Sequence, residues 1–256
     1  MSEVDLVIPV YNEGPAIYPM LDALLEHVRF DYRIYICHDH PDDTTVAAIH
    51  AYPDLRKLPL SLIQNEGEGV CDAIFSGIRA GKGAAVIVMP ADDTFNAALL
   101  NEMAARFSQG AQVVCPSRFM SGGCMTGCPW FKSILVRTAA FTLYHVARLP
   151  THDPTNGFRL FSRRLLQSIP VEASEGFAFS LELLVKAHRR GIKIAELPAQ
   201  WHERQAGKSR FRLFHWLPLY LRWYVYAFFG RPEQTEVKSM PQEDIPLPGN
   251  SAAVRS

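Results

Sequence analysis

Two neighbouring carboxylates, Asp92 and Asp93, stand three and four residues after the end of the apolar, β-branched run AAVIVM at residues 84–89. Such a run is typical of a buried strand, so the pair is expected at a strand end. Carboxylate oxygens suit Mg²⁺ or Mn²⁺, hard cations that commonly share their coordination with substrate phosphates. The pair also has a structural reading, because an aspartate caps helix N-termini and a helix is expected near residues 96–108.

Acidic side chains follow two earlier apolar runs as well. Glu13 comes after DLVIPVYN (residues 5–12), and Asp39 comes after YRIYICH (residues 32–38). Three acidic strand ends close together would repel one another without a cation or hydrogen-bond donors, which favours a ligand site over a purely structural role. Asp43 keeps a structural alternative, since it precedes two threonines and is able to cap the next helix.

A glycine-containing turn, NEGEG at residues 65–69, joins the third predicted strand to its helix. Glycine at this position allows the backbone to approach a phosphate group at a helix N-terminus. The pattern matches neither the P-loop nor the complete dinucleotide fingerprint. A phosphate-binding role near Gly69 and a plain turn are therefore equally compatible with the sequence.

Basic side chains gather in the second half of the chain. Residues 1–100 contain 6 basic against 15 acidic side chains, a balance of −9, so the zero net charge of the whole chain leaves +9 for the remainder. Arg118 follows a predicted strand, Lys132 and Arg137 belong to a long helical pattern, and Arg204 stands in the run ERQAGKSR. Arg118 and the cluster around Arg204 are candidate anion-binding residues, whereas solvated surface is the expectation for most of the other basic side chains. A neutral chain without a recognised binding motif argues against nucleic acid as a partner.

Alternating strands and helices position these residues. The alternation runs from residue 5 to 118 and indicates a mainly parallel sheet with helices on both faces, in which ligands bind beyond the carboxyl ends of the strands. A long helix over 130–149, a loop over 151–161, a helix near 176–190 and a strand over 194–201 are expected to follow. The sequence thus predicts an α/β domain over residues 1–210.

The segment 211–230 is rich in aromatic residues, and basic residues crowd its start. We expect an amphipathic helix lying in the membrane interface over anionic head groups and bent at Pro218; a core helix or dimer face is the alternative. Spanning is disfavoured, because Arg222 near the middle would cost about 2.5 to 3.5 kcal/mol. Residues 231–256 contain four prolines and no aromatic residue, which predicts a disordered tail.

Composition limits the class of protein. With 48% apolar and 11% aromatic residues, the chain is a folded globular protein. Its five cysteines are an odd number in a chain large enough to form a core, so we expect reduced thiols and no disulfide framework. Cys124 and Cys128 lack the further ligands of a zinc site. No secretion signal or long uncharged stretch is visible, which predicts a cytoplasmic protein, peripheral to the membrane.

An ordered series of motifs closely resembles the family 2 glycosyltransferases of the dolichyl-phosphate mannose synthase type. The resemblance extends over roughly residues 4–226 and is more specific than any one motif. The motifs are VIPVYNE (7–13), HDHPDDTT (38–45), NEGEGVCDAIFSG (65–77), VMPADDT (88–94), SRFMSGG (117–123), DPTNGFRLF (153–161) and ELPAQWHERQAGKSRF (196–211).

This resemblance implies a GT-A fold, a nucleotide-sugar donor, a divalent cation (Mg²⁺ or Mn²⁺) bound to the diphosphate, and inversion at the anomeric carbon. Carried over by motif, Gly69 lies near the nucleotide, and four residues contact its base and ribose: Pro9, Tyr11, Glu13 and Asp39.

The resemblance also implies roles on the reacting side. Asp92 matches the last aspartate of the metal motif, while Pro90 replaces the first, so Asp93 is the candidate second carboxylate. Acceptor phosphate is implied at Arg118, Lys132 and Arg137, and Arg204 and Ser209 belong to a loop that closes over both substrates. The predicted catalytic residues are Asp92, Asp93, Arg118 and Arg204, and the predicted metal ligands are Asp92 and Asp93.

The implied acceptor is a polyprenyl phosphate, with oligomeric state left open. Its phosphate has a second pKa of about 6 and is largely ionised at neutral pH, so its attack requires no strong general base. An acceptor hydroxyl would require one, with Asp153 or Asp93 as first candidates. The alternatives are transfer to a glycan or protein, and a nucleotide-sugar-binding protein impaired by Pro90.

Overall fold

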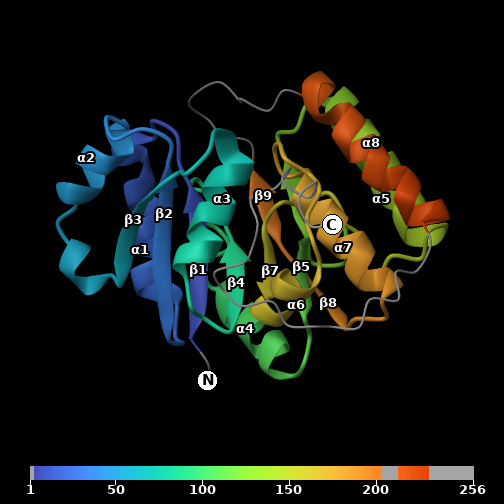
Figure 1. The fold of residues 1–256 in the computed structure, drawn as a ribbon, viewed down its shortest axis with the longest axis horizontal. Helices are drawn as coiled ribbons and strands as arrows, with labels where there is room; N and C mark the ends of the chain where they lie inside the picture. Colours follow the sequence, from blue (N-terminus) through green and yellow to red (C-terminus); the bar gives the residue numbers. More distant parts are fainter. Residues whose placement is uncertain (1–2, 203–212, 231–256) are drawn as a thin grey trace, which may run out of the picture.

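A seven-stranded mixed sheet forms the centre of the computed structural model, which describes residues 3–202 and 213–230 (Figure 1). Within these residues the strand order is β3-β2-β1-β4-β7-β5-β8. All neighbouring pairs are parallel except those of β7, which is antiparallel to β4 and β5. The strands are β1 (Val4–Pro9), β2 (Tyr32–His38), β3 (Leu60–Gln64), β4 (Ala85–Val88), β5 (Val113–Ser117), β7 (Arg159–Ser162) and β8 (Ile194–Pro198).

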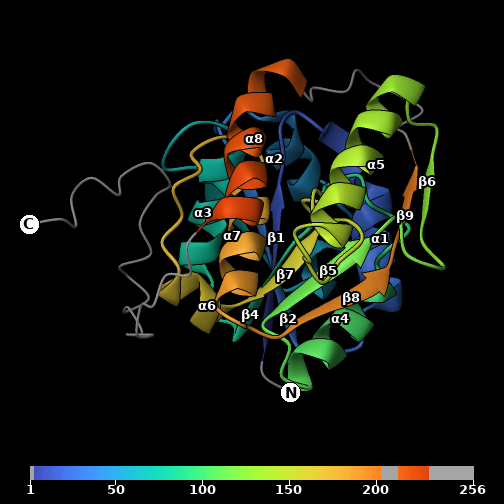
Figure 2. The same cartoon turned by 90° about the vertical axis from the view of Figure 1, so that its right-hand side faces the viewer.

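Helices cover both faces of this sheet (Figures 1 and 2). Successive side chains of β1 point to opposite faces, so Val7 packs in one cluster with α3 and α7, while Leu6 and Ile8 pack in the other with α1 and α4. The helices are α1 (Tyr18–His27), α2 (Thr44–His50), α3 (Gly69–Ala80), α4 (Leu99–Ser108), α5 (Trp130–His145), α6 (Arg163–Ser168), α7 (Ala178–Arg189) and α8 (Leu213–Phe229), with 3₁₀ turns η1 (Gly14–Ile17) and η2 (Leu55–Lys57).

The predicted strand over 194–201 is two strands in two sheets. β8 ends at Pro198, and β9 (Gln200–His202) pairs in parallel with β6 (Cys124–Thr126) in a separate two-stranded ribbon. Ala199 forms the corner between them: its N–H donates to Ser117 and its carbonyl accepts from Cys124. Periodicity could not reveal this corner, because both strands share one apolar pattern.

Three further expectations differ from the structure. The predicted loop over 151–161 contains the start of β7, whose four residues are all buried, and the helix predicted over 130–149 ends at His145. The helix predicted near 96–108 begins only at Leu99, because the residues before it are held in a turn.

The helix α8 lies beside α5 and packs on α7 (Figures 1 and 2). Its Trp223 is buried, and the charged groups of Lys186 and Arg222 each lie 4.9 Å from the centroid of the Trp223 ring. Glu172 binds both cations, so a charged network attaches the helix to the domain. Among the described residues, no helix is both long and apolar enough to cross a membrane.

Candidate functional site

The predicted donor-side residues lie along one edge of the sheet. β1 pairs in parallel with β2 on one side and with β4 on the other. All three strands therefore end at the same edge, where Glu13, Asp39 and Asp92 follow them. Pro9 is the last residue of β1, and Tyr11, two residues later, is 45% exposed at this edge. The register thus gathers the sequence-predicted residues at one rim.

A hydrogen-bonded clamp joins the ends of β1 and β2. Asp43 accepts from the N–H of Asn12 at 2.9 Å and from the N–H of Thr45 at 2.8 Å, and the Thr45 hydroxyl accepts from the N–H of Glu13 at 2.9 Å. Burial by itself would raise the pKa of Asp43, but these hydrogen bonds outweigh it and lower that pKa below its ordinary value. The structural alternative for Asp43 is confirmed: it caps α2, and it also positions the loop that carries Glu13.

Asp39 is held beside the turn that precedes α3. Its carboxylate accepts from the Asn65 side chain at 2.7 Å, and the same amide group donates to the carbonyl of Gly69 at 3.2 Å. Gly69 has φ +81°, a conformation that favours glycine, and a Cβ added there would meet nothing within 4 Å. The turn thus leaves open space at the N-terminus of α3, next to Asp39. Asn65 was not among the predicted site residues, although it opens the NEGEG turn.

Asp92 and Asp93 stand in the turn after β4. The Asp93 Oδ1 accepts from the N–H groups of Phe95 and Asn96 at 3.2 and 3.0 Å, and both Asp93 oxygens accept from the Asn96 side chain at 2.9 and 2.7 Å. Burial raises the pKa of Asp93; the Asn96 bonds oppose the rise and the Asp92 charge adds to it. Asp93 therefore organises the turn, while the Asp92 side chain is exposed at the rim.

This donor set fits a divalent cation that is shared with a substrate. Among the described residues, no three histidine, cysteine or acidic side chains lie close enough to hold a metal by themselves. Mg²⁺ and Mn²⁺ are commonly bound by one or two carboxylates together with substrate phosphates. Asp92 at the strand edge, with Asp93 beside it, has the carboxylate oxygens that such a shared site requires.

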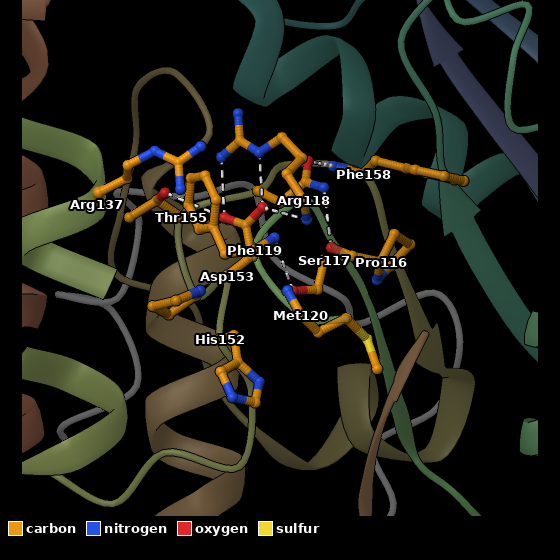
Figure 3. A network of polar contacts seen from close by, with 12 residues as sticks. Pro116, Ser117, Arg118, Phe119, Met120, Arg137, His152, Asp153, Thr155 and Phe158 are labelled. Atoms are coloured by element: carbon orange, nitrogen blue, oxygen red, sulfur yellow. Dashed lines mark hydrogen bonds and ion pairs between the residues drawn. The ribbon is translucent and has the colours of Figure 1, made fainter. Parts of the chain in front are cut away.

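Arg118 makes a bidentate ion pair with Asp153 (Figure 3). Its Nε and Nη2 donate to the two Asp153 oxygens at 2.6 and 2.9 Å, and its main-chain N–H donates at 3.0 Å. The Asp153 side chain is fully buried and that of Arg118 is 14% exposed. Burial alone would lower the pKa of Arg118, but the Asp153 charge reverses this and raises it. Arg118 is thus fixed in orientation and permanently charged.

Two further cations predicted to bind acceptor phosphate lie on α5. The guanidinium of Arg137 is 4.8 Å from the centroid of the Phe119 ring, and the Arg118 guanidinium is 5.1 Å from that same centroid. Figure 3 shows Arg118 and Arg137 on one side of Asp153, while His152 points to the other. Lys132 lies over the ring of Trp201 in β9, at 5.9 Å. The structure thus brings Arg118 and Arg137 together at the Phe119 ring, while Lys132, on the same helix as Arg137, lies over β9.

A buried guanidinium that sequence analysis left aside lies beneath this cluster. Arg159 is fully buried, and its Nη2 donates to the main-chain carbonyl of Asp153 at 3.3 Å. Its Nη1 donates to the carbonyl and hydroxyl oxygens of Ser180 at 2.8 and 3.0 Å. Arg159 stood out only as part of the DPTNGFR motif, and no local pattern marks it as buried. The predicted residues Arg204 and Ser209 lie outside the described residues.

Comparisons with known proteins decide the class of this site. A family model described as Glycosyl transferase family 2 matches residues 5–169. The chain belongs to this family. It is therefore a glycosyltransferase, as the ordered motifs predict.

Two curated relatives are similar over most of the chain. A polyprenol monophosphomannose synthase of Mycolicibacterium smegmatis is 27% identical over 212 residues, covering 80% of this chain and 79% of that protein. A dolichyl-phosphate hexose transferase of Haloferax volcanii is 29% identical over 212 residues, covering 82% of this chain and 86% of that protein.

Solved structures show the same fold. Glucosyl-3-phosphoglycerate synthase from Mycobacterium tuberculosis, crystallised with Mn²⁺, uridine diphosphate and glucosyl-3-phosphoglycerate, superimposes with a TM-score of 0.63 at 16% identity, covering 91% of this chain and 82% of that one. The same enzyme with Mn²⁺, UDP-glucose and phosphoglyceric acid gives a TM-score of 0.63 at 17% identity, covering 92% and 81%. The expected GT-A glycosyltransferase fold is confirmed.

Proposed function

We propose that this glycosyltransferase moves a sugar from a nucleotide-diphosphate sugar, such as GDP-mannose or a UDP-hexose, to a polyprenyl phosphate at the cytoplasmic face of a membrane. The names of its curated relatives, a polyprenol monophosphomannose synthase and a dolichyl-phosphate hexose transferase, support a lipid phosphate as acceptor. They do not separate mannose from another hexose, so the donor is proposed as a class.

The observation that carries the proposal is the engagement of both candidate bases. Asp153 is fully buried and binds Arg118 through both oxygens, and Asp93 accepts four hydrogen bonds from Phe95 and Asn96. A hydroxyl acceptor needs a base within reach of its proton. A phosphate acceptor arrives largely ionised, because its second pKa is about 6. The site therefore suits a phosphate nucleophile better than a glycan or protein hydroxyl.

Each group of predicted site residues has its own role in the proposed sugar transfer. An acceptor phosphate oxygen forms a bond to the anomeric carbon as the bond from that carbon to the diphosphate oxygen breaks, which inverts the configuration. A divalent cation held by Asp92, and by Asp93 beside it, would offset charge on the departing diphosphate. Arg118, Lys132 and Arg137 bind and orient the acceptor phosphate; Pro9, Tyr11, Glu13, Asp39 and Gly69 bind the nucleotide.

The proposed membrane contact rests on two neighbouring helices. Four exposed apolar residues of α5 repeat at helical spacing: Trp130 (74% exposed), Phe131 (56%), Ile134 (57%) and Phe141 (61%). On α8, which is joined to α5 by a 2.7 Å hydrogen bond between Thr142 and Tyr224, Leu221, Val225 and Phe229 are exposed.

Neither helix contains an acidic residue, whereas both contain basic ones, which suits an anionic lipid surface. A polyprenyl phosphate would enter from that surface, and Lys132 and Arg137 stand on the same helix as the apolar residues of α5. We therefore include α5 in the membrane-facing surface that the sequence placed on residues 211–230 alone.

The test of the catalytic proposal is transfer of radiolabelled sugar from GDP-mannose and UDP-hexoses to a short polyprenyl phosphate, with Mg²⁺, Mn²⁺ or EDTA. Product that requires both the lipid phosphate and the cation is expected. Transfer to soluble glycans or peptides without lipid product would contradict the proposed acceptor, and nucleotide binding without any turnover would favour an impaired binding protein.

The test of the membrane proposal is vesicle co-sedimentation with phosphatidylcholine, with or without phosphatidylglycerol. Replacing Ile134 and Phe141 together by serine should weaken binding on the order of 100-fold or more, because each buried side chain contributes about 1.5 to 3 kcal/mol. Val46→Ser on α2, at the opposite end of the molecule, is the control (Figure 1). Equal binding of all three proteins would show that these helices do not face lipid.

A further inference from the structure

The turn that carries the two aspartates is fastened to β9 by the side chain of Asn96. Asn96 is 4% exposed, and its amide nitrogen donates to the carbonyl of Gln200 at 2.7 Å while its amide oxygen accepts from the N–H of Gln200 at 3.0 Å. The same amide nitrogen donates to both oxygens of Asp93. One side chain thus connects the turn after β4 with a strand 104 residues away along the chain.

A second contact joins the same two elements. The ring of Phe95, 58% exposed in the turn, lies 4.3 Å from the ring of His202 in β9, centroid to centroid. Between Gln200 and His202, Trp201 lies under the ammonium group of Lys132. The connection therefore runs from Asp93 through Asn96 to β9, and from β9 to a cation of the acceptor side.

We propose that Asn96 is a positioning residue that sets the metal-binding turn and the acceptor-side strand β9 in one fixed relation. The inference rests on the proposed function, because it assigns the turn to the donor diphosphate and Lys132 to the acceptor phosphate. Asn96 lies outside the ordered motifs, so the inference rests on the contacts of its side chain alone.

The physical reason lies in how completely the amide is used. Asn96 is itself buried, and its amide oxygen and nitrogen are both hydrogen-bonded, so a substitution leaves the half-buried Asp93 carboxylate and the peptide groups of the exposed Gln200 without those partners. Asp93 would keep only the bonds from the main-chain N–H groups of the turn, and of its contacts with the turn β9 would keep that between Phe95 and His202. Groups that orient a metal ligand typically affect metal affinity by about 10- to 100-fold. An in-line displacement is sensitive to shifts of about 1 Å between its two substrates.

The experiment compares Asn96→Ala with Asn101→Ala. Asn101 is a matched control, because its side chain also joins two elements: it accepts from the N–H of Arg29 at 2.8 Å and donates to the carbonyl of His27 at 2.8 Å, away from both substrates. Two quantities are measured: the Mn²⁺ concentration that half-saturates thermal stabilisation by a nucleoside diphosphate, and the KM for a short polyprenyl phosphate.

For Asn96→Ala, the half-saturating Mn²⁺ concentration is expected to rise on the order of 10-fold and the acceptor KM to rise with it. Asn101→Ala should change both by less than about twofold, as expected for a surface substitution that touches neither substrate. Should Asn96→Ala fail to fold, Phe95→Ala breaks the second, exposed contact; it is expected to raise the acceptor KM with little change in stability.

Three outcomes would overturn the inference. In the first, Asn96→Ala lowers only the melting temperature and matches Asn101→Ala in both measured quantities. In the second, the Mn²⁺ requirement changes while the acceptor KM does not. In the third, Asn96→Ala does not fold and Phe95→Ala leaves the acceptor KM unchanged. Failure of the wild-type protein to bind any nucleoside diphosphate or use any lipid phosphate would instead contradict the proposed function itself.

Discussion

Replacing Asp153 by asparagine separates a positioning carboxylate from a catalytic base. In the wild type, Arg118 binds both Asp153 oxygens, and the side chains are 14% and 0% exposed, respectively. The asparagine has the same shape but offers one acceptor oxygen, and its NH₂ group faces a second N–H donor. Removing one partner of a buried ion pair costs about 3 to 5 kcal/mol. For a chain of this size that corresponds to a fall in melting temperature of roughly 6 to 20 °C.

The catalytic consequence follows from the orientation of Arg118. Without the bidentate ion pair to Asp153, the Arg118 guanidinium is free to rotate. A displacement of about 1 Å at a positioned group costs on the order of 100-fold in rate. We expect kcat/KM for the lipid phosphate to fall by about that factor. The acid limb of the pH–rate profile should stay near pH ~6 in both proteins, because it reports ionisation of the acceptor phosphate.

A matched control exists at the amino-terminal end of β1, away from the carboxyl ends of the strands where the predicted site lies. Arg163 and Asp5 form another buried pair, 2.6 Å apart and 8% and 0% exposed. Asp5→Asn should therefore cost comparable stability yet leave kcat/KM unchanged at a temperature where both variants are folded. Disappearance of the acid limb in Asp153→Asn would refute the reasoning and identify Asp153 as a general base. Unchanged kcat/KM would show that Arg118 needs no orienting partner.

Three further predictions concern other parts of the site. Asp92→Asn should abolish the Mn²⁺-dependent part of the stabilisation by a nucleoside diphosphate, which is about 2.7 kcal/mol at a ligand concentration of 100 Kd. If calorimetry found this Mn²⁺-dependent stabilisation retained, the metal assignment would be contradicted. Asp43→Ala should cost about 1 to 3 kcal/mol in urea unfolding and raise the donor KM, because it releases the loop before Glu13. Glu172→Gln should weaken the attachment of α8 by roughly 1 to 2 kcal/mol at pH 7, a modest value because Glu172 is 33% exposed. Burial alone would raise the pKa of Glu172, but Lys186 and Arg222 lower it below 4.5. The stability difference between the wild type and Glu172→Gln should therefore vanish as the pH falls through that lowered pKa. A stability difference that persists at acid pH would mean that the charge is not responsible.

The sequence was most informative where local pattern and burial coincide. β4 is an unbroken apolar run, and β1 and β2 are mostly apolar despite Asp5 and Arg33, so all three are recognisable as strands, and the polar residues after them fall on one edge as predicted. The cap formed by Asp43 is equally local, because its main-chain partner Thr45 is two residues away. Such features need no knowledge of the rest of the chain.

The features that the sequence did not reveal depend on distant partners. Asn96 is tied to Gln200, 104 residues away, and Arg118 to Asp153, 35 residues away. Pairings of this kind are set by how strands are ordered in the sheet, and the insertion of antiparallel β7 was itself not predicted. For the same reason Asp153 remained a candidate base in the sequence, because only the ion pair shows that both of its oxygens are engaged.

In the proposed reaction, the charges around Asp153 would hold an anionic nucleophile near an anionic leaving group. The Asp153 carboxylate binds Arg118, and its main-chain carbonyl binds the fully buried Arg159, so two guanidinium groups surround one carboxylate and leave a local charge of about +1. Asp153 therefore fixes the orientation of the Arg118 guanidinium. The positive charge of Arg159 is buried beneath Asp153, where water does not screen it. Arg137 and Lys132 add cations from α5, where the exposed apolar residues are found. In the proposed reaction, a cation bound at Asp92 would offset the charge of one anion and the cations around Asp153 that of the other, which lowers their mutual repulsion without requiring a base.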